Sequence, residues 1–63
     1  MSYMKNIYIE TIEETENLST PELQNLLRIK NIQLGVEDEL FEMLSDEQLI
    51  TLIGEKNILL ASK

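Results

Sequence analysis

The amino-acid sequence predicts a mainly α-helical fold, a small bundle of three short helices with room for one N-terminal β-strand. Three observations lead to this prediction. One stretch of the chain occurs twice, each copy opens with a helix-capping pattern, and leucines recur within each copy at helical spacing. The 63 residues suffice for one domain. In it we expect an N-terminal strand or arm with an acidic link (1–17) and a helical part that contains the repeat (18–63).

The repeat aligns residues 18–32 with residues 44–58. Two equal segments imply two similar helices, because the same spacing of apolar side chains defines the buried face of each. Seven positions are identical in the two copies: Leu18, Ser19, Leu23, Leu26, Lys30, Asn31 and Ile32 return as Leu44, Ser45, Leu49, Leu52, Lys56, Asn57 and Ile58.

Each copy carries a start signal for a helix. Ser19 is followed three residues later by Glu22, and Ser45 is followed by Gln48 at the same distance. This is the capping box, in which the side chain of each of these two residues hydrogen-bonds to the backbone N–H of the other. The leucine before each serine has the spacing of a hydrophobic staple. Helices are therefore expected from each serine to about Lys30 and Glu55.

The ends of these helices are expected at asparagine. Asn31 and Asn57 suit the left-handed conformation that often stops a helix, and Gly54 is an earlier possible stop in the second copy. After Asn31, a short extended link should lead through Gly35 to a third helix over residues 36–43. The acids that open this third segment complement the positive end of a helix dipole.

The N-terminal segment has a different composition. Residues 6–12 are rich in β-branched and aromatic side chains, which favours a strand. A helix over residues 5–16 is the alternative, because Tyr8, Ile12 and Thr15 also align at helical spacing. The triplet Lys-Asn-Ile occurs three times, either as the sign of three short extended segments or, as we favour, by coincidence of composition.

The region from residue 18 to residue 44 resembles the helix–extended–helix pattern of SAP- and LEM-like modules. The resemblance rests on the spaced leucines, the Lys-Asn-Ile run after them and the following Glu-Leu-Phe-Glu-Met-Leu segment. Such modules often bind DNA through basic residues near the second helix. This chain has acidic residues there, so the resemblance implies a helical fold and carries no nucleic-acid binding over to it.

Charge narrows the classes of partner. Twelve acidic residues against five basic ones give a net charge of −7. Contacts to nucleic-acid phosphates and to anionic membranes need Lys and Arg, so neither partner is expected. A protein with a basic surface is favoured, since opposite fields speed encounter, although such a charge also simply keeps a small domain dispersed. The candidate partner-binding acids are Glu10, Glu13, Glu14, Glu16, Glu37, Asp38, Glu39 and Glu42.

Catalysis, cofactors and metal ions are not expected. The chain has no His and no Cys, and Ser19 and Ser45 are explained by capping. A domain of this size is also too small to enclose a substrate pocket of the usual ~300 Å³ or more. The acids of residues 37–39 lack the alternating oxygens of a calcium loop. Without a signal-peptide or membrane-spanning pattern, a cytoplasmic location is expected.

Apolar residues that depart from the repeat indicate a contact surface. Ile29 and Ile50 lie off the expected core stripes, at positions where the other copy carries Glu55 and Gln24. Met43 is a flexible side chain suited to adaptable interfaces. The alternative is a core that extends further around the helices. A domain this small is also often stabilised by association, so a homodimer is expected, with a lone monomer as the alternative.

Two functions are consistent with these features. The first is a non-enzymatic, acidic protein-binding module, in the manner of phage- or plasmid-encoded antagonists that occupy a basic, nucleic-acid-binding surface of a host protein. The second is a structural or assembly protein that associates with itself through an apolar helical face. Salt separates the two, because screening weakens charge-driven binding and high salt favours apolar burial.

Overall fold

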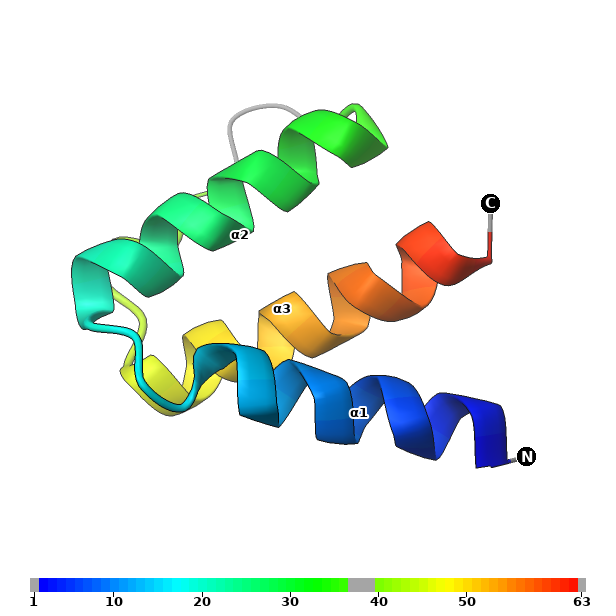
Figure 1. Cartoon of the computed structure of the whole chain (residues 1–63). Helices are drawn as coiled ribbons and strands as arrows, with labels where there is room; N and C mark the ends of the chain where they lie inside the picture. The colour runs from blue at the N-terminus through cyan, green and yellow to red at the C-terminus, as the bar shows by residue number, and fades with distance from the viewer. Residues whose placement is uncertain (1, 37–39, 63) are drawn as a thin grey trace.

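The computed structural model describes residues 2–36 and 40–62, and their side chains from residue 6 onward. It contains the helices α1 (Ser2–Thr15), α2 (Thr20–Leu34) and α3 (Asp46–Ala61) in chain order (Figure 1). The mainly helical fold and the small three-helix bundle are therefore confirmed. The positions of the helices differ from the expectation in three respects.

The first difference is α1, because the strand expected over residues 6–12 is wrong. The N-terminal segment is helical, and no strand occurs in the described residues. Its threonines bond within the helix: the Thr11 hydroxyl donates to the Ile7 carbonyl at 2.8 Å, and the Thr15 hydroxyl donates to the Thr11 carbonyl at 2.7 Å. Both threonines are buried against the rest of the molecule. Tertiary packing thus overrides the strand preference of β-branched residues.

The second difference is where α2 and α3 end. Asn31 is buried inside α2, and α2 continues to Leu34. Gly35 then takes the left-handed conformation, with φ 77° and ψ 19°. The N–H groups of Gly35 and Val36 donate to the carbonyls of Ile32 and Asn31 at 3.1 and 2.9 Å, which is the Schellman motif. Glycine pays no steric cost at positive φ, so it ends the helix in preference to asparagine.

In the second copy, the helix likewise passes both expected stops. Gly54 and Asn57 lie within α3, which ends at Ala61. All three Lys-Asn-Ile triplets are therefore helical, and the extended link expected after Asn31 is wrong as well. The SAP- and LEM-like pattern needs that link between two helices, so the structure does not follow it.

The third difference concerns the helix expected over residues 36–43. Val36 and Leu40 through Leu44 are loop and turn, whereas residues 37–39 lie outside the described part of the chain. The third helix of the bundle is α1, at the N-terminus. In place of a helical face, the segment between α2 and α3 contributes one buried anchor, Phe41, which is 4% exposed.

The expected helix starts are present. The Ser45 N–H donates to the Gln48 side-chain oxygen at 2.9 Å, and the Gln48 N–H donates back to the Ser45 hydroxyl at 3.3 Å. In α2, the Glu22 carboxylate accepts from the Ser19 N–H at 2.8 Å and from the Ser19 hydroxyl at 2.9 Å. These hydrogen bonds lower the pKa of Glu22 below its ordinary value of 4.5, first through the backbone N–H and then through the hydroxyl.

A pH-dependent difference between the two caps follows. Because the Glu22 pKa is lower in the folded chain, its contribution to stability is present above the ordinary pKa and is lost as pH falls through the folded pKa. Glu22→Gln should therefore cost most at pH values above the ordinary pKa of 4.5, and the cost should shrink as the pH falls below that value. Thermal unfolding of both proteins across this range measures the difference. Gln48→Glu is the matched gain-of-charge control and should acquire the same drop in α3, and a flat difference for both variants would contradict the role assigned to Glu22.

The two copies of the repeat are arranged as neighbouring helices that run in the same direction (Figure 1). Their first residues meet, with the Thr20 hydroxyl donating to the Asp46 carboxylate at 2.6 Å. These are equivalent positions of the two copies, so α2 and α3 start side by side. The small apolar core follows the repeat, since Leu23 and Leu27 of α2 and their counterparts Leu49 and Ile53 of α3 are all buried.

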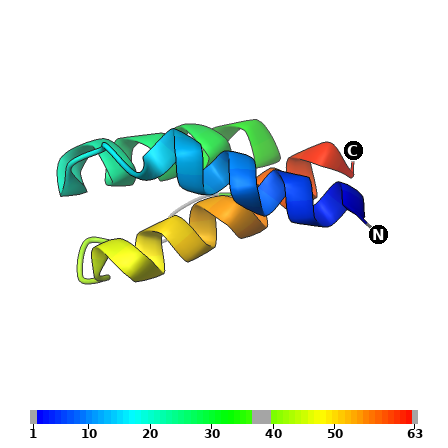
Figure 2. The ribbon, with the colours of Figure 1, turned by 60° about the horizontal axis from the view of Figure 1, so that its bottom comes forward.

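Helix α1 packs on α3 in the opposite direction and contacts α2 only weakly. Figure 2 shows α1 in front, with α2 and α3 behind it. Gly54 of α3 lets α1 and α3 approach closely at this contact. A Cβ at Gly54 would lie 3.2 Å from the Tyr8 ring and 3.7 Å from the Thr11 methyl group. No described side chain of α1 joins the buried apolar cluster, so α1 is held by close approach rather than by a leucine face.

Candidate functional site

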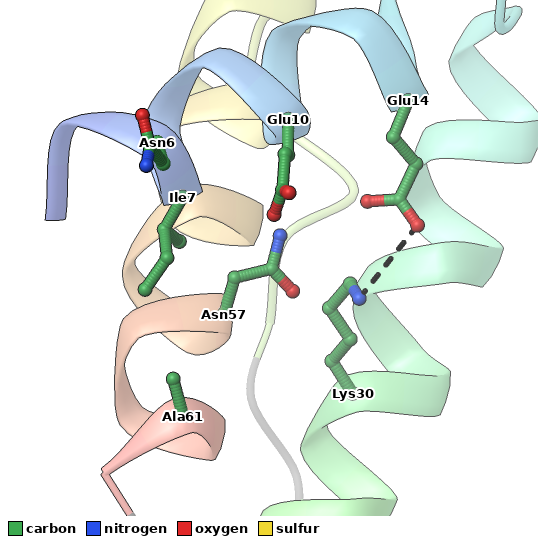
Figure 3. A pocket seen from close by; sticks show the side chains of 7 residues that line it. All are labelled: Asn6, Ile7, Glu10, Glu14, Lys30, Asn57 and Ala61. Carbon is green, nitrogen blue, oxygen red and sulfur yellow. Dashed lines mark ion pairs between the residues drawn. The ribbon is translucent and has the colours of Figure 1, made fainter. Parts of the chain in front are cut away.

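An open groove of about 640 Å³ lies among the three helices, on the side where α1 and α2 diverge (Figures 1 and 3). It is wide enough to accept part of another molecule without enclosing it. Its lining combines carboxylates, amides, one amine and two apolar side chains, drawn from all three helices: Asn6, Ile7, Glu10 and Glu14 of α1, Lys30 of α2, and Asn57 and Ala61 of α3.

The α1 wall of the groove carries two carboxylates. Glu10 and Glu14 are four residues apart and so share one face of the helix, and Figure 3 shows both reaching toward Asn57 and Lys30. Lys30 Nζ lies 3.9 Å from Glu14 Oε2, with side chains that are 12% and 43% exposed. Among the described residues, none forms an ion pair or hydrogen bond with the Glu10 carboxylate. The wall therefore holds one paired and one available negative charge.

The α3 side of the groove carries an amide of fixed orientation. Asn57 Nδ2 donates to Thr11 Oγ1 at 2.7 Å. The Thr11 hydroxyl donates its hydrogen bond to the Ile7 carbonyl, so its oxygen must act as the acceptor toward Asn57. The Asn57 amide is thereby held with its nitrogen on Thr11. Figure 3 shows this nitrogen on the side of Glu10 and the amide oxygen on the side of Lys30.

Basic side chains in the described part of the chain are engaged within the molecule. The Arg28 guanidinium lies over the Phe41 ring, 5.8 Å from its centroid. Lys30 pairs with Glu14, and Lys56 is buried with 8% of its surface exposed. Lys30 and Lys56 thus have little exposed surface, whereas Arg28 is exposed and lies against an aromatic ring.

The predicted acidic residues are spread over the surface rather than gathered at one site. Glu10 and Glu14 line the groove, whereas Glu13 and Glu16 are exposed elsewhere on and just after α1. Glu42 is exposed in the segment before α3. The predicted residues Glu37, Asp38 and Glu39 lie outside the described part of the chain. The structure therefore brings two of the predicted acids together in a hollow and leaves at least three apart from it.

The predicted apolar residues have different environments. Met43 is 98% exposed and Ile29 is 46% exposed. Ile50 is half-buried and packs against the core cluster, as the alternative of a wider core expected. A shallow hollow of about 390 Å³ lies near Met43 in sequence, lined by Leu44, Glu47, Gln48, Thr51 and Leu52.

Sequence patterns did not indicate the exposed apolar side of α1. Tyr8, Ile9 and Ile12 are 45%, 54% and 54% exposed, and they fall at helical spacing once the segment is known to be a helix. The groove residues Asn6, Lys30, Asn57 and Ala61 were not identified as site residues either. The only signal was the repeated Lys-Asn pair, in which Asn31 and Asn57 were expected to mark helix ends.

The described residues offer hydrogen-bonding and ion-pairing chemistry. They contain no group of three or more His, Cys, Asp or Glu side chains positioned to hold a metal ion. The Glu22 carboxylate, whose pKa is lowered, serves the helix cap and is fully exposed. The groove thus presents charged carboxylates and an amide that can form ion pairs and hydrogen bonds.

Fold and site together define a small acidic three-helix protein with an open polar groove. Comparison with known proteins found no matching family, no matching curated protein and no matching solved structure. Within residues 2–36 and 40–62, no helix combines the length and the apolar character that crossing a membrane requires.

Proposed function

We propose that this chain is a non-enzymatic protein-binding module that docks through its acidic surface on a basic surface of another protein. The distribution of charge is the observation that carries the proposal. Arg28, Lys30 and Lys56 are engaged or buried within the molecule, whereas the carboxylates of α1 are exposed. The net charge of −7 is therefore presented outward, where it attracts a positive surface.

Helix α1 is the best candidate for the docking element. It carries Glu10, Glu13, Glu14 and, just after its end, Glu16, so its C-terminal half is negative. Its half-exposed Ile9 and Ile12 lie among these acids. Charges of this kind steer encounter and fix register, whereas apolar contacts add affinity once they are buried. A partner surface with basic residues around an apolar patch would match both features.

A protein of this kind acts by covering the basic surface of its partner. A negative helix that covers a basic surface prevents that surface from binding nucleic acid, whose phosphates need the same Lys and Arg side chains. This is how we propose that the chain works, in the cytoplasm and in the manner of phage- or plasmid-encoded antagonists. The inhibition requires no chemistry in the module itself.

Charge reversal on α1 tests the proposal. The immobilised chain is exposed to a bacterial lysate at low salt, and a bound basic protein is identified, purified and titrated against the wild-type and variant chains. Glu13→Lys should weaken binding at least about fivefold, because it replaces an attraction by a repulsion. Binding should also fall steeply between about 0.05 and 0.2 M salt.

Glu55→Lys is the control for this experiment. Glu55 is exposed on α3, and its reversal changes the net charge by the same amount. If binding to the partner depends on α1, Glu55→Lys changes the affinity less than about twofold. Equal effects of the two reversals, or binding that is indifferent to salt, would contradict docking through α1.

Self-association is the second candidate function, and one observation favours it. Large apolar side chains are unusually exposed for so small a molecule, most of all Leu40 at 86% and Met43 at 98%. Burial of such side chains between copies would remove them from water. Sedimentation across a concentration series at low and high salt tests this, since a homodimer held by apolar burial should persist or tighten at high salt. A monomer at high micromolar concentration under both conditions would exclude it.

A further inference from the structure

We infer that the groove between α1, α2 and α3 is a seat for an arginine side chain of the basic partner. The inference rests on the proposed function and assigns a specific chemistry to one part of the acidic surface. It follows from three features of the groove: a negative charge that is not neutralised, an acceptor of fixed orientation, and apolar lining beside both.

Charge is the first feature. Glu10 and Glu14 are like charges on one face of α1, an arrangement that is unfavourable unless cations lie near. Lys30 supplies one cation, at 3.9 Å from Glu14. Its ammonium shows that the groove accommodates a positive group against this wall (Figure 3). Glu10 remains, so one further cation would complete the neutralisation of the site.

Hydrogen-bond geometry is the second feature. The Asn57 amide is held by Thr11, so its oxygen is presented to the groove before any ligand arrives. A guest that lies between Glu10 and Lys30 would also reach this oxygen, which is on the Lys30 side of the Asn57 amide (Figure 3). Guanidinium has five N–H donors in a planar fork and can bond a carboxylate through two of them while another reaches a second acceptor. An ammonium is more strongly hydrated and lacks this fork, so arginine is favoured over lysine.

Apolar lining is the third feature. Ile7 and Ala61 border the groove beside the polar groups. The three-carbon stem of arginine can cover such side chains while its head is bound to oxygen. The volume of about 640 Å³ leaves room for the neighbouring backbone of the partner. The occupant is therefore an arginine carried on a protein segment that lies along α1.

Nuclear magnetic resonance tests this with a defined probe. Nα-acetyl-arginine amide is titrated into the isotope-labelled full chain. Nα-acetyl-lysine amide, whose side chain carries the same charge, is titrated in parallel. Arginine should shift the amide signals of groove residues, chiefly Asn6, Ile7, Glu10, Asn57 and Ala61, and the lysine probe should bind several-fold more weakly. Shifts that are equal for the two probes, or equally large around Glu16 and Glu55, would overturn the inference.

Matched variants locate the binding group. Glu10→Gln should weaken the arginine probe about tenfold, as expected for the loss of a charged hydrogen-bond acceptor. Glu16→Gln makes the same change of net charge just after the end of α1, outside the groove lining, and should change binding less than about twofold. Circular dichroism of each variant confirms that the helices are retained. Equal effects of the two substitutions would show a diffuse attraction and overturn the groove as the seat.

The outcomes separate this inference from the proposed function. If the partner still binds in a way that is sensitive to Glu13→Lys while neither probe shifts the groove signals, the arginine seat is wrong and docking through α1 stands. If arginine binds the groove and is lost with Glu10→Gln, but no partner is sensitive to α1 charge reversal, the seat is real and the proposed function fails.

Discussion

Replacing Leu27 with alanine is expected to unfold a large share of the molecules at room temperature. Leu27 has no exposed surface and belongs to a cluster in which the described part of the chain has five buried apolar residues. Truncation of a buried leucine costs about 2–5 kcal/mol through lost transfer energy and the cavity left behind. A domain of this length has a total stability near the low end of the usual range, on the order of 5 kcal/mol. Chemical denaturation followed by circular dichroism measures the loss.

Two further variants keep this prediction open to refutation if the alanine variant does not fold. Ile53→Val removes one methyl group from the same core and should cost about 0.5–1.5 kcal/mol. Ile29→Ala removes a larger group from the exposed face of α2, and its effect should stay within about 0.5 kcal/mol. Similar losses for the core and surface variants would mean that the leucines of the repeat do not form the core described above.

Gly54→Leu is expected to separate α1 from α3. A Cβ added at this position would lie 3.2 Å from the Tyr8 ring, so a branched side chain has no space unless α1 moves away. Overpacking of this kind typically costs about 1–3 kcal/mol. Here it would also break the Asn57–Thr11 hydrogen bond, which depends on the same close approach. Hydrogen exchange should show faster exchange of the α1 amides, while α2 and the first half of α3 stay protected.

Gly54→Ala is the control for this substitution. Alanine gains roughly 1 kcal/mol of helix propensity over glycine, and the half-exposed Tyr8 ring can turn to relieve a contact of 3.2–3.3 Å. The alanine variant should therefore be as stable as the parent or more so. Unchanged protection of α1 in Gly54→Leu would show that the contact at Gly54 does not hold α1 in place.

Gly54→Leu should also change the groove and its binding of arginine. Movement of α1 takes Glu10 away from Asn57, so this variant should lose arginine binding although it retains every residue that lines the groove. Gly54→Ala should retain it. The pair therefore tests whether the site depends on the placement of α1, independently of any change in charge.

Local patterns predicted the parts of the fold that depend on neighbouring residues. The capping boxes at Ser19 and Ser45 were predicted because each is closed within four residues of chain. The buried leucines followed from helical spacing alone. Helix ends were less predictable, because Asn31 and Gly35 both suit the end of a helix. The outcome depended on the burial of Asn31 against the rest of the molecule.

The candidate site was the least predictable part. Glu10 and Glu14 were among the predicted acids, but nothing in the sequence placed them opposite Lys30 and Asn57. That arrangement requires α1 to be a helix and to cross α3 at Gly54. Neither follows from local pattern, since the same N-terminal residues have a strand preference when considered alone.

By itself, the sequence determined the composition of the molecule and its local order: a negative net charge, a duplicated capped helix and the leucines that those helices bury. Only the tertiary structure decided that the N-terminal segment is a helix and that a groove lies beside it. The physical reason is the range of the interactions. Caps and apolar periodicity act within a few residues, whereas the contacts of Thr11 with Asn57 and of Tyr8 with Gly54 join residues 46 positions apart in the chain.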